Sequence, residues 1–554
     1  MADCSLDISV VTRDSGRSLP AFFDSLRGQQ LPLHGVGLYL RDAGSSDATP
    51  GLLEAFARQA GGLFRHVRVD IGSDPGFGAG HNANCALAEA EFVLIATPDL
   101  CFEPATLAIL LRQAQEDAPD VAAWECRQKP CEDDKDYHPA TGETAWNAGA
   151  CVLYRRAALR TAGGYERCLH RRGAQVELSF RLRRLGYRLR YVPRAGVWRA
   201  PAQEPASTLP TARAALAHVL LRCRYGSARE AARGFGMYLR LLSRSRCPPA
   251  LRTRLAGQLP RLLWLAPRFA LSRQPSGARF TFGHWTYGGS RAGAGEPQPQ
   301  VPHAAPPLVS VLIRTVPGRG GCLREALASV AAQTHEAIHL VIAEDGGDSA
   351  RAQAQAARAS GRYREVTYLP LPKRGRCAAG NAALAAAQGE LLCFLDDDDL
   401  LYADHLEILA AAMMARPGLA AACGWALEVR TRVDSREPWR YREESRQVLY
   451  QRPFDRAALW QHNYLPIQSV LFSRKLYEAH GGFDPELDLL EDWNLWVRYS
   501  LRHDFEMVPR ITSLFRVPAA PDEAQRRRVS LEAWHEVARA KHAALMTAGR
   551  PSVR

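Results

Sequence analysis

The stretch LLCFLDDDDL, residues 391–400, decides the fold expected for this chain. Its first five residues are apolar and predict a buried strand. Four aspartates follow at once, and carboxylates packed this closely repel one another unless positive charge neutralises them. A Mg²⁺ ion would do so, because it takes one or two protein carboxylates and completes its shell with water and substrate phosphates. The alternative is a solvated acidic turn before the helix expected from about Tyr402.

The composition is that of an ordinary globular protein, with 47% apolar and 23% charged residues among 554. This length predicts two to four domains. The sequence has no run of 18 apolar residues, and its start lacks a basic segment followed by a long apolar one. We therefore expect neither a transmembrane helix nor a signal peptide, and a cytoplasmic location.

The net charge of +13 is concentrated in the middle of the chain. Residues 201–300 contain fifteen arginines, three glutamates and neither lysine nor aspartate, a net charge of +12. Helices are expected there at 212–242 and 251–271. Basic helices with aromatic residues bind anionic membranes, so one expectation is that residues 201–287 rest on the inner face of the cell membrane. The other is a helical linker whose arginines are solvated or paired with acids of flanking domains. No recognition motif accompanies the charge, so nucleic acid is not expected.

The same pattern occurs twice in the chain. The strand LDISVVT (6–12) resembles LVSVLIRT (308–315), and GFGAGHNANCALAEAEFVLIATPD (76–99) resembles GRCAAGNAALAAAQGELLCFLDDDD (375–399). Strands that alternate with helices predict a mostly parallel α/β sheet. A repeat of about 300 residues means two copies of one domain. In the first copy the glycines between 76 and 80 are expected to form a loop before the next helix.

Acidic residues follow the predicted strands. Asp42 and Asp99 do so in the first copy, and Asp345 takes the place of Asp42 in the second. Ligands of parallel α/β sheets bind beyond the carboxyl ends of the strands, so these residues are candidates for a binding site. Glu491 and Asp492 begin a helix, where the helix dipole favours acids. A carboxylate held at the end of an element also suits a general base.

Both copies resemble glycosyltransferase family 2, whose members are inverting enzymes of the GT-A fold. In the second copy the resemblance is carried by VSVLIRT, the EDG turn, GRCAAGNAAL, FLDDDD and GGFDPELDLLEDWNLWVR. The first copy carries DAGSSD, GFGAGHN, TPD, WNAGACVLYRR, GGYER and VELSFRLRRLGYRLRYVP, and it resembles the rhamnosyltransferase-like branch.

The resemblance implies an α/β protein with two Rossmann-like GT-A domains joined by an Arg-rich helical segment. The expected divisions are an N-terminal domain at 1–200, a basic helical connector at 201–287, a Gly/Pro-rich linker at 288–306, a C-terminal domain at 307–518, and a helix and tail at 519–554.

The resemblance also implies roles for residues of the second copy. Asp345 and Thr315 would bind the base of a nucleotide-sugar donor, and Arg376 would contact its diphosphate. Asp396 and Asp398 match the DxD motif, with Asp398 the more direct ligand of a divalent Mg²⁺ or Mn²⁺ ion. The remaining role, that of the general base, would belong to Asp492. In the first copy, Asp42 and Asp99 are the corresponding donor-binding candidates.

The first copy departs from the family pattern at its acidic motif. Gln175 stands where the base aspartate is expected, and glutamine cannot accept a proton at neutral pH. Glu177 would replace it only if the helix began one turn later. The first copy is therefore expected either to bind a donor or glycan without catalysis or, alternatively, to be active through Glu177.

The expected function is transfer of a sugar from a nucleotide sugar to a hydroxyl of a glycan acceptor. A lipid-linked saccharide or a glycoprotein of the bacterial surface would be the acceptor. Three alternatives remain: both copies transfer sugars, the first copy only binds glycans, or the chain is a metal-dependent nucleotidyltransferase. The last class opens with a basic phosphate loop, and LVSVLIRTVPGRGG has glycines but no lysine.

Overall fold

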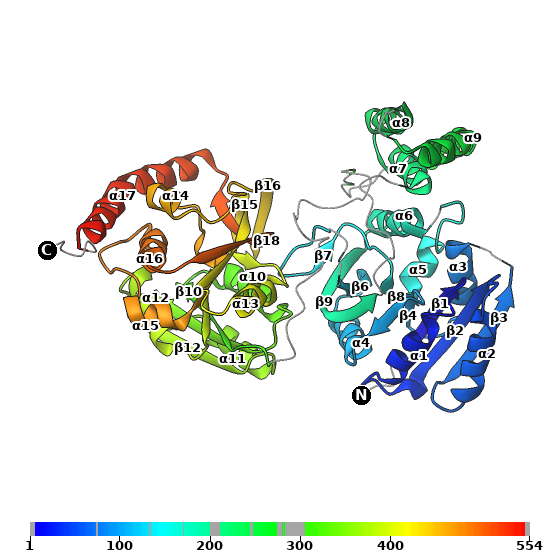
Figure 1. Cartoon of the computed structure of the whole chain (residues 1–554), viewed down its shortest axis with the longest axis horizontal. Coiled ribbons are helices and arrows are strands. Elements are labelled where there is room, and N and C mark those ends of the chain that lie inside the picture. Colours follow the sequence, from blue (N-terminus) through cyan, green and yellow to red (C-terminus); the bar gives the residue numbers. More distant parts are fainter. Residues whose placement is uncertain are drawn as a thin grey trace. The chain divides into compact units, whose positions relative to one another are not determined.

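The computed structural model describes residues 6–73, 76–130, 132, 135–169, 171–199, 211–243, 247–273, 280, 282 and 305–548. The chain forms two compact units, one of residues 1–138 and 142–297 and one of residues 298–554 with 139–141 (Figure 1). Each unit is an α/β structure whose sheet is covered by helices. The two-domain α/β fold predicted from the sequence is thereby confirmed.

The N-terminal unit contains one mixed sheet. Its strands are β1 (Leu6–Thr12), β2 (Val36–Ala43), β3 (His66–Gly72), β4 (Phe92–Ala96), β5 (Leu100–Phe102), β6 (Val121–Lys129), β7 (Glu143–Thr144), β8 (Cys151–Arg155) and β9 (Arg188–Arg199). They lie in the order β3-β2-β1-β4-β8-β6-β9-β5, and β7 pairs with β9. β1 is parallel to β2 and β4, whereas β8 is antiparallel to β4 and β6.

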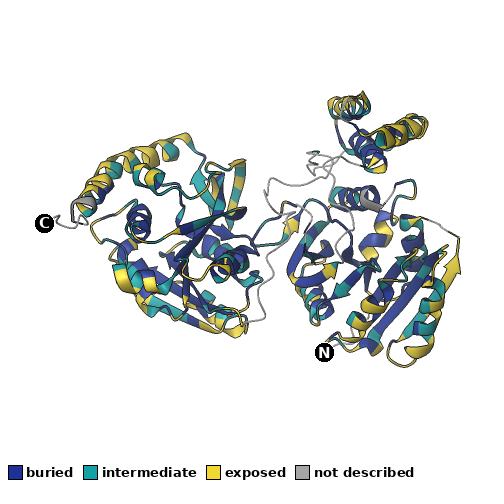
Figure 2. Ribbon diagram, viewed as in Figure 1, coloured by how far each residue is buried: buried dark blue, intermediate teal, exposed yellow. Residues whose placement is uncertain are grey.

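Helices cover both faces of this sheet because the strands carry apolar side chains on both sides (Figure 2). The helices are α1 (Leu19–Arg27), η1 (Leu33–Gly35), α2 (Thr49–Gln59), α3 (Phe77–Leu87), α4 (Thr106–Glu116), α5 (Arg156–Ala162) and α6 (Arg171–Arg184). One core holds apolar residues of α1, α2 and α4 with Ile8 and Val10 of β1. A second core holds residues of α5 and α6 with Val93 and Ile95 of β4.

The C-terminal unit repeats this plan. Its strands are β10 (Val309–Thr315), β11 (Ile338–Asp345), β12 (Glu365–Leu371), β13 (Leu391–Asp396), β14 (Leu400–Leu401), β15 (Ala421–Arg436), β16 (Trp439–Gln447), β17 (Val470–Ser473) and β18 (Phe505–Pro518). Eight of them lie in the order β12-β11-β10-β13-β17-β15-β18-β14, which matches the order of the first sheet, whereas β16 pairs with β15. The predicted duplication is confirmed.

The helices of this unit include one long C-terminal helix. They are α10 (Gly320–Ala331), α11 (Arg351–Ala359), α12 (Arg376–Ala386), α13 (His405–Ala415), α14 (Arg456–Gln461), η2 (Ile467–Ser469), α15 (Arg474–His480), α16 (Glu491–Ser500) and α17 (Pro521–Ala548). α17 lies in the segment 519–554, where a helix and tail were predicted, and its Ala538 is buried in the core that also holds Trp493 and Trp496 of α16.

The basic connector differs from its prediction in two respects. The helix expected at 212–242 is divided at Gly226, so the segment forms α7 (Ala212–Tyr225), α8 (Ala228–Ser243) and α9 (Pro249–Leu271). α7 is mostly buried and shares a core with α6, so these helices are packed into the N-terminal unit. Residues 288–304 of the predicted linker lie outside the described residues.

The predicted glycine loop is also corrected, because α3 begins at Phe77 and includes Gly78 and Gly80. A Cβ atom on Gly80 would lie 3.0 Å from Val11, and one on Gly78 would lie 3.0 Å from Tyr165. Glycine therefore serves here to let the helix pack closely on its neighbours.

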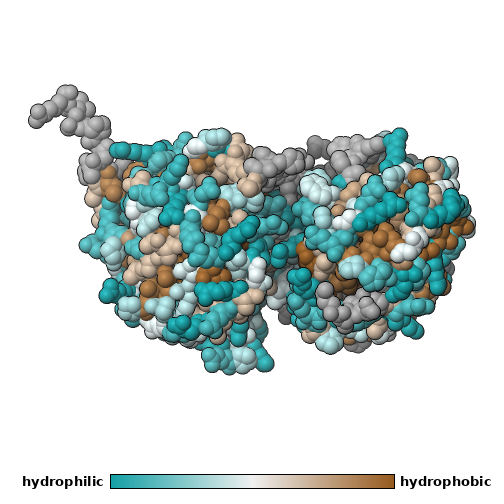
Figure 3. All heavy atoms as spheres, turned by 90° about the horizontal axis from the view of Figure 1, so that it is seen from below, coloured by the Kyte–Doolittle hydropathy of each residue, from teal (hydrophilic) through white to brown (hydrophobic). Residues whose placement is uncertain are grey.

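The outer surface carries hydrophilic side chains with hydrophobic ones exposed between them (Figure 3). Within the described ranges, no helix has the length and apolar character needed to cross a membrane.

Candidate active site

Three predicted donor-binding residues lie at one edge of the C-terminal sheet. β10 ends at Thr315, β11 at Asp345 and β13 at Asp396. β10 is parallel to both neighbours, so the three carboxyl ends meet at the same edge. This edge is where ligands of parallel α/β sheets bind.

Two adjoining cavities open at this edge. The small cavity has a volume of about 270 Å³ and is lined by Thr315 and Asp345. The large cavity has a volume of about 800 Å³ and is lined by Asp492 at the start of α16. Both cavities are lined by Arg314, Arg376, Asp396 and Asp398. The six residues predicted for the second copy are therefore brought together.

Asp345 is buried beneath the segment that follows β12. It accepts hydrogen bonds from Lys373 Nζ at 2.8 Å and from the backbone N–H groups of Arg374 and Gly375 at 2.7 and 3.1 Å. Burial raises the pKa of Asp345, but these hydrogen bonds outweigh it and hold the pKa below its ordinary value. The carboxylate is thus charged and fixed in the wall of the small cavity.

Arginines neutralise much of the acidic loop. Arg319 pairs with Asp397 at 2.7 Å and with Asp398 at 2.6 Å. The backbone N–H of Arg516 donates to Asp399 at 3.1 Å. Burial raises the pKa of Asp397 to about 6 and that of Asp399 well above its ordinary value, which reduces the charge further. Arg319 therefore supplies part of the positive charge for which a Mg²⁺ ion was predicted.

Arg314 links the acidic loop to the helix that carries the predicted base. Its guanidinium donates to both oxygens of Asp396 at 2.9 and 3.0 Å and to Glu491 at 2.9 Å. Burial raises the pKa of Asp396, but the charge of Arg314 outweighs it and keeps the pKa low. Arg376 Nη1 lies 3.5 Å from Glu491 and leaves half of its side chain exposed. Arg314 and Arg376 thus line both cavities, and Arg314 is fixed by Asp396 and Glu491.

Asp398 is the carboxylate that best fits a divalent cation. Its side chain is 40% exposed although it pairs with Arg319, whereas Asp396 is 28% exposed and both of its oxygens accept from Arg314. In the described part of the chain, no three His, Cys, Asp or Glu side chains form a protein-only metal site. A cation shared with substrate phosphates needs only one or two carboxylates, so the loop fits such a cation through Asp398.

Asp492 lies at the wall of the large cavity. One of its oxygens accepts from Asn463 Nδ2 at 3.0 Å, and the other accepts from its neighbour's backbone N–H at 2.8 Å. Burial, and then the nearby charge of Glu491, raise the pKa of Asp492 to about 7. A carboxylate with such a pKa can accept a proton near neutral pH.

Several residues of this site were not predicted from the sequence. They are Arg314, Arg319, Asn463, Glu491 as a partner of Arg314, Arg516, Arg527 and Arg528. Arg314 had a readable signal, because it is the one charged residue in the apolar strand VSVLIRT. Arg527 and Arg528 line the large cavity from α17. They had no readable signal in the sequence, since only the fold brings that helix to the site.

The sheet register corrects the predicted correspondence between the two copies. β1 and β10 both end in a threonine. In the strand register, Thr12 is the partner of Asp42 in the first sheet, and Thr315 is the partner of Glu344 in the second. Asp42 therefore corresponds to Glu344 and not to Asp345 as predicted, and Ala43 takes the position of Asp345.

Asp42 and Asp99 have partners within their own unit. Asp42 is buried and accepts from Thr12 Oγ1 at 3.0 Å and from the backbone N–H of Ser45 at 2.9 Å. Asp99 pairs with Arg199 at 2.7 Å. Neither is among the described residues that line the cavity at the edge of this sheet.

The acidic motif of the first copy is occupied by structural contacts. The Gln175 side chain is buried and donates to the carbonyl of Gly149 at 2.7 Å. A Cβ atom on Gly149 would lie 2.1 Å from Gln175, so the two are in close contact. Gln175 lies inside α6, which begins at Arg171. Glu177 therefore also lies inside α6 and not at its start, where a base is expected.

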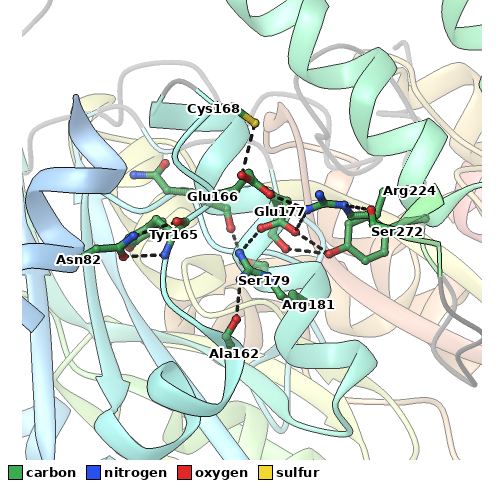
Figure 4. A network of polar contacts seen from close by, with 12 residues as sticks. Asn82, Ala162, Tyr165, Glu166, Cys168, Glu177, Ser179, Arg181, Arg224 and Ser272 are labelled. Carbon is green, nitrogen blue, oxygen red and sulfur yellow. Dashed lines mark hydrogen bonds and ion pairs between the residues drawn. The ribbon is translucent and has the colours of Figure 1, made fainter. Parts of the chain in front are cut away.

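Glu177 of α6 instead forms ion pairs and a hydrogen bond that join α6 to α7 of the connector (Figure 4). It is fully buried, pairs with Arg181 and with Arg224 at 2.7 Å, and accepts from Tyr225 Oη at 2.8 Å. Arg224 also reaches Glu166 at 3.0 Å. At least one arginine of the connector, Arg224, therefore pairs with acids of the flanking domain. This pairing agrees with the expectation of a helical linker whose arginines are solvated or paired.

A known family matches both copies. The model of the family described as Glycosyl transferase family 2 matches residues 7–166 and residues 312–481. The chain belongs to glycosyltransferase family 2. It is a tandem member of this family, and the nucleotidyltransferase alternative is not supported.

Similar proteins include other members of this class. Succinoglycan biosynthesis protein ExoW of Rhizobium meliloti (strain 1021) is 36% identical over 108 residues, which are 19% of this chain and 33% of ExoW. The uncharacterised glycosyltransferase YwdF of Bacillus subtilis (strain 168) is 24% identical over 217 residues, 39% of this chain and 76% of YwdF. The chain thus matches only a third of the length of ExoW.

Solved glycosyltransferases are also similar. Mannosyltransferase PcManGT from Pyrobaculum calidifontis, in complex with GDP-Man and Mn²⁺, has a TM-score of 0.33 and 17% identity, over 48% of this chain and 72% of that chain. A fragment of S. aureus TarS in complex with UDP-GlcNAc has a TM-score of 0.34 and 15% identity, over 49% of this chain and 84% of that chain.

Proposed function

We propose that the C-terminal unit is an inverting glycosyltransferase that moves a sugar from a nucleotide sugar to a hydroxyl of a glycan acceptor. The observation that carries this proposal is the large cavity, where Asp492 shares one lining with Arg376 and Asp398. A proton acceptor and groups that can hold a diphosphate leaving group are what one displacement at the sugar carbon requires.

Each residue of the site would have a role in donor binding or in catalysis. Asp345 and Thr315 would hold the nucleotide base in the small cavity, and Arg376 and Arg314 would attract the diphosphate. Asp492 would take the proton of the acceptor hydroxyl. A Mg²⁺ or Mn²⁺ ion bound to Asp398, with Asp396 behind it, would supply positive charge for the leaving group.

The acceptor proposed is a lipid-linked saccharide or a glycoprotein of a bacterial surface polysaccharide or glycoconjugate. ExoW is named for succinoglycan biosynthesis, which supports a polysaccharide product. A place on the inner face of the membrane is proposed for the connector, because Leu263, Trp264 and Leu271 of α9 expose more than half of their side chains.

The N-terminal unit is proposed to be non-catalytic. The supporting observation is the contact between Gln175 and Gly149, which fills the place of the base with a side chain that accepts no proton.

Nucleotide release from a panel of nucleotide sugars, with Mg²⁺ or Mn²⁺, tests both proposals without knowledge of the acceptor. We expect one donor to be turned over and the double variant Asp396→Ala/Asp398→Ala to be inactive. Turnover that survives in the double variant would instead place chemistry in the N-terminal unit and make the enzyme bifunctional. Absence of turnover with every donor would contradict the proposed function.

A further inference from the structure

Arginines hold two aspartates of the acidic loop, residues 396–399, through both of their oxygens. Asp396 accepts from Arg314 at 2.9 and 3.0 Å. Asp397 accepts from Arg319 Nε at 2.8 and 2.9 Å. A carboxylate with both oxygens on a guanidinium must give up a charge-assisted hydrogen bond before it can bind a cation. These two aspartates are therefore poor first ligands for a divalent cation.

Asp398 is more exposed than these two aspartates and also contacts Arg319. Its side chain is 40% exposed, against 28% for Asp396 and 5% for Asp397. Arg319 Nη2 lies 2.6 Å from Asp398 Oδ2 and 2.7 Å from Asp397 Oδ1. One guanidinium thus pairs both with a buried aspartate and with the exposed aspartate that best fits a cation.

The guanidinium of Arg319 is charged and fixed in this place. Arg319 stands directly before the first turn of α10, and the Asp397 carboxylate that it grips is also held by Thr315 Oγ1 at 2.6 Å. Burial lowers the pKa of Arg319, but the charges of Asp398 and Asp397 outweigh burial and raise the pKa above its ordinary value. A permanent positive charge therefore lies against Asp398.

This charge opposes the binding of a free cation to Asp398. A divalent cation on the Asp398 carboxylate would lie close to the guanidinium of Arg319, and like charges repel strongly in a partly buried site. The cation would also compete with Arg319 for Asp398 Oδ2. We therefore expect the loop by itself to bind a divalent cation weakly.

A diphosphate group changes this balance. Arg319, Arg376 and Asp398 all line the small cavity, in which the donor is proposed to bind. Phosphate oxygens complete the shell of a Mg²⁺ ion and also accept from guanidinium groups. Negative charge that lies between the cation and Arg319 reduces the repulsion between them. The cation and the diphosphate are therefore expected to strengthen the binding of each other.

We propose that Arg319 weakens the affinity of Asp398 for a free divalent cation, so that the acidic loop binds the cation together with a diphosphate group. Arg319 is a residue that couples the two ligands and is not itself a ligand of the cation. This inference rests on the cation role proposed for Asp398 and adds a residue that controls it.

Titration of the full chain with Mn²⁺, followed by the electron paramagnetic resonance signal of the free ion, tests the proposal without an activity assay. We expect Arg319→Gln to bind Mn²⁺ about tenfold more tightly than wild type, because a positive charge beside the ligand is removed. Arg319→Lys, which keeps the charge, should bind Mn²⁺ like wild type. Adding Asp398→Asn to Arg319→Gln should abolish the gain. Arg324→Gln, which removes an exposed charge from the same helix, is the matched control and should have no effect.

Three results would overturn the proposal: an affinity for Mn²⁺ that is unchanged or lower in Arg319→Gln, an equal gain in Arg324→Gln, or a gain that persists when Asp398→Asn is added. Circular dichroism checks the fold of each variant. If Arg319→Gln does not fold because Asp397 stays buried without its partner, Arg319→Gln/Asp397→Asn removes both partners. That double variant should bind Mn²⁺ about tenfold more tightly than Asp397→Asn alone.

A second titration, in the presence of UDP or GDP and corrected for Mn²⁺ bound by the nucleotide alone, tests the coupling. We expect one of the nucleotides to raise the Mn²⁺ affinity of wild type, and to raise that of Arg319→Gln by a smaller factor. No increase with either nucleotide, or an equal increase in the two proteins, would contradict the coupling.

Failure of this inference and failure of the proposed function give different results. Mn²⁺ binding that requires Asp398 but does not respond to Arg319→Gln overturns the inference alone. Absence of Mn²⁺ binding in every variant, with and without nucleotide, would overturn the cation role of Asp398 and the inference with it.

Discussion

Arg314 interrupts the apolar strand β10, and its buried guanidinium lies between Asp396 and Glu491. Removing one partner of a buried ion pair is costly because the other charge stays buried without compensation. Here the other charges are two carboxylates that belong to the loop and the helix of the candidate site. Arg314 is therefore a positioning residue whose removal should affect both stability and activity.

We expect Arg314→Met to lower the free energy of unfolding by about 3–5 kcal/mol, because two carboxylates lose their partner. Chemical unfolding followed by fluorescence measures this. Arg324→Ala, on the exposed side of α10, is the matched control and should change stability by less than about 0.5 kcal/mol. A loss no larger than that of the control would show that the buried ion pairs do not form.

Asp492 is the residue on which the proposed chemistry depends. We expect Asp492→Asn to reduce nucleotide release with acceptor by about 10²–10⁴-fold, the usual contribution of a general base. Steady-state kinetics at saturating donor measure it. Asp488→Asn, an exposed aspartate in the preceding segment, should have no effect. Equal rates for wild type and Asp492→Asn would remove Asp492 from the role of base.

The pH dependence follows from the raised pKa of Asp492. A base acts only when deprotonated, so the rate should be low below pH 7 and rise as the pH passes through about 7. The ratio kcat/KM measured between pH 5 and 9 should show this rising limb. The limb should be absent in Asp492→Asn, and a limb that persists in that variant belongs to another group.

At the scale of elements, the site is assembled from the ends of strands and the starts of helices. α12 begins at Arg376 and α16 begins beside Asp492, so both helices direct their first turns to the cavities. α17 adds a wall from the far end of the sequence. Trp493 of α16 stacks on His535 of α17 with ring centroids 5.0 Å apart, which holds this wall in place.

Arg527 and Arg528 of α17 should contribute to substrate binding because they line the large cavity. We expect Arg527→Ala/Arg528→Ala to raise KM for donor or acceptor by about tenfold, since a hydrogen bond to a charged group contributes about 1.5–3 kcal/mol. The melting temperature should not change. Arg526→Ala, its exposed neighbour outside the cavity lining, is the control, and an equal effect there would indicate a general charge effect.

At the scale of the whole molecule, two copies of one sheet have diverged in charge. The C-terminal copy has four aspartates, Asp396 to Asp399, where the N-terminal copy has Thr97, Pro98 and Asp99, and Ala43 stands at the position of Asp345. The N-terminal copy also incorporates α7–α9: α7 packs on α6 through Glu177 and Arg224, and α8 and α9 pack on α7. Duplication has thus produced units with the same strand order and different chemistry.

The C-terminal unit has its own cores, so residues 305–548 should fold and act when separated. We expect donor hydrolysis within about threefold of the full chain, and none from residues 6–273. Nucleotide release from the two purified pieces measures this, with circular dichroism as the check on folding. A folded but inactive C-terminal piece would show that catalysis requires the N-terminal unit.

The duplication, the α/β class and the residues at strand ends could be predicted from the sequence, because apolar strands and the polar residues that end them are local patterns. The folded chain was needed to show that Arg314 bridges two distant carboxylates, that Asp42 corresponds to Glu344, and that Glu177 pairs with the connector. Partners and register depend on which segments pack together, and composition and spacing along one chain do not encode them. For the same reason, only the fold brings Arg527 and Arg528 of α17 to the large cavity.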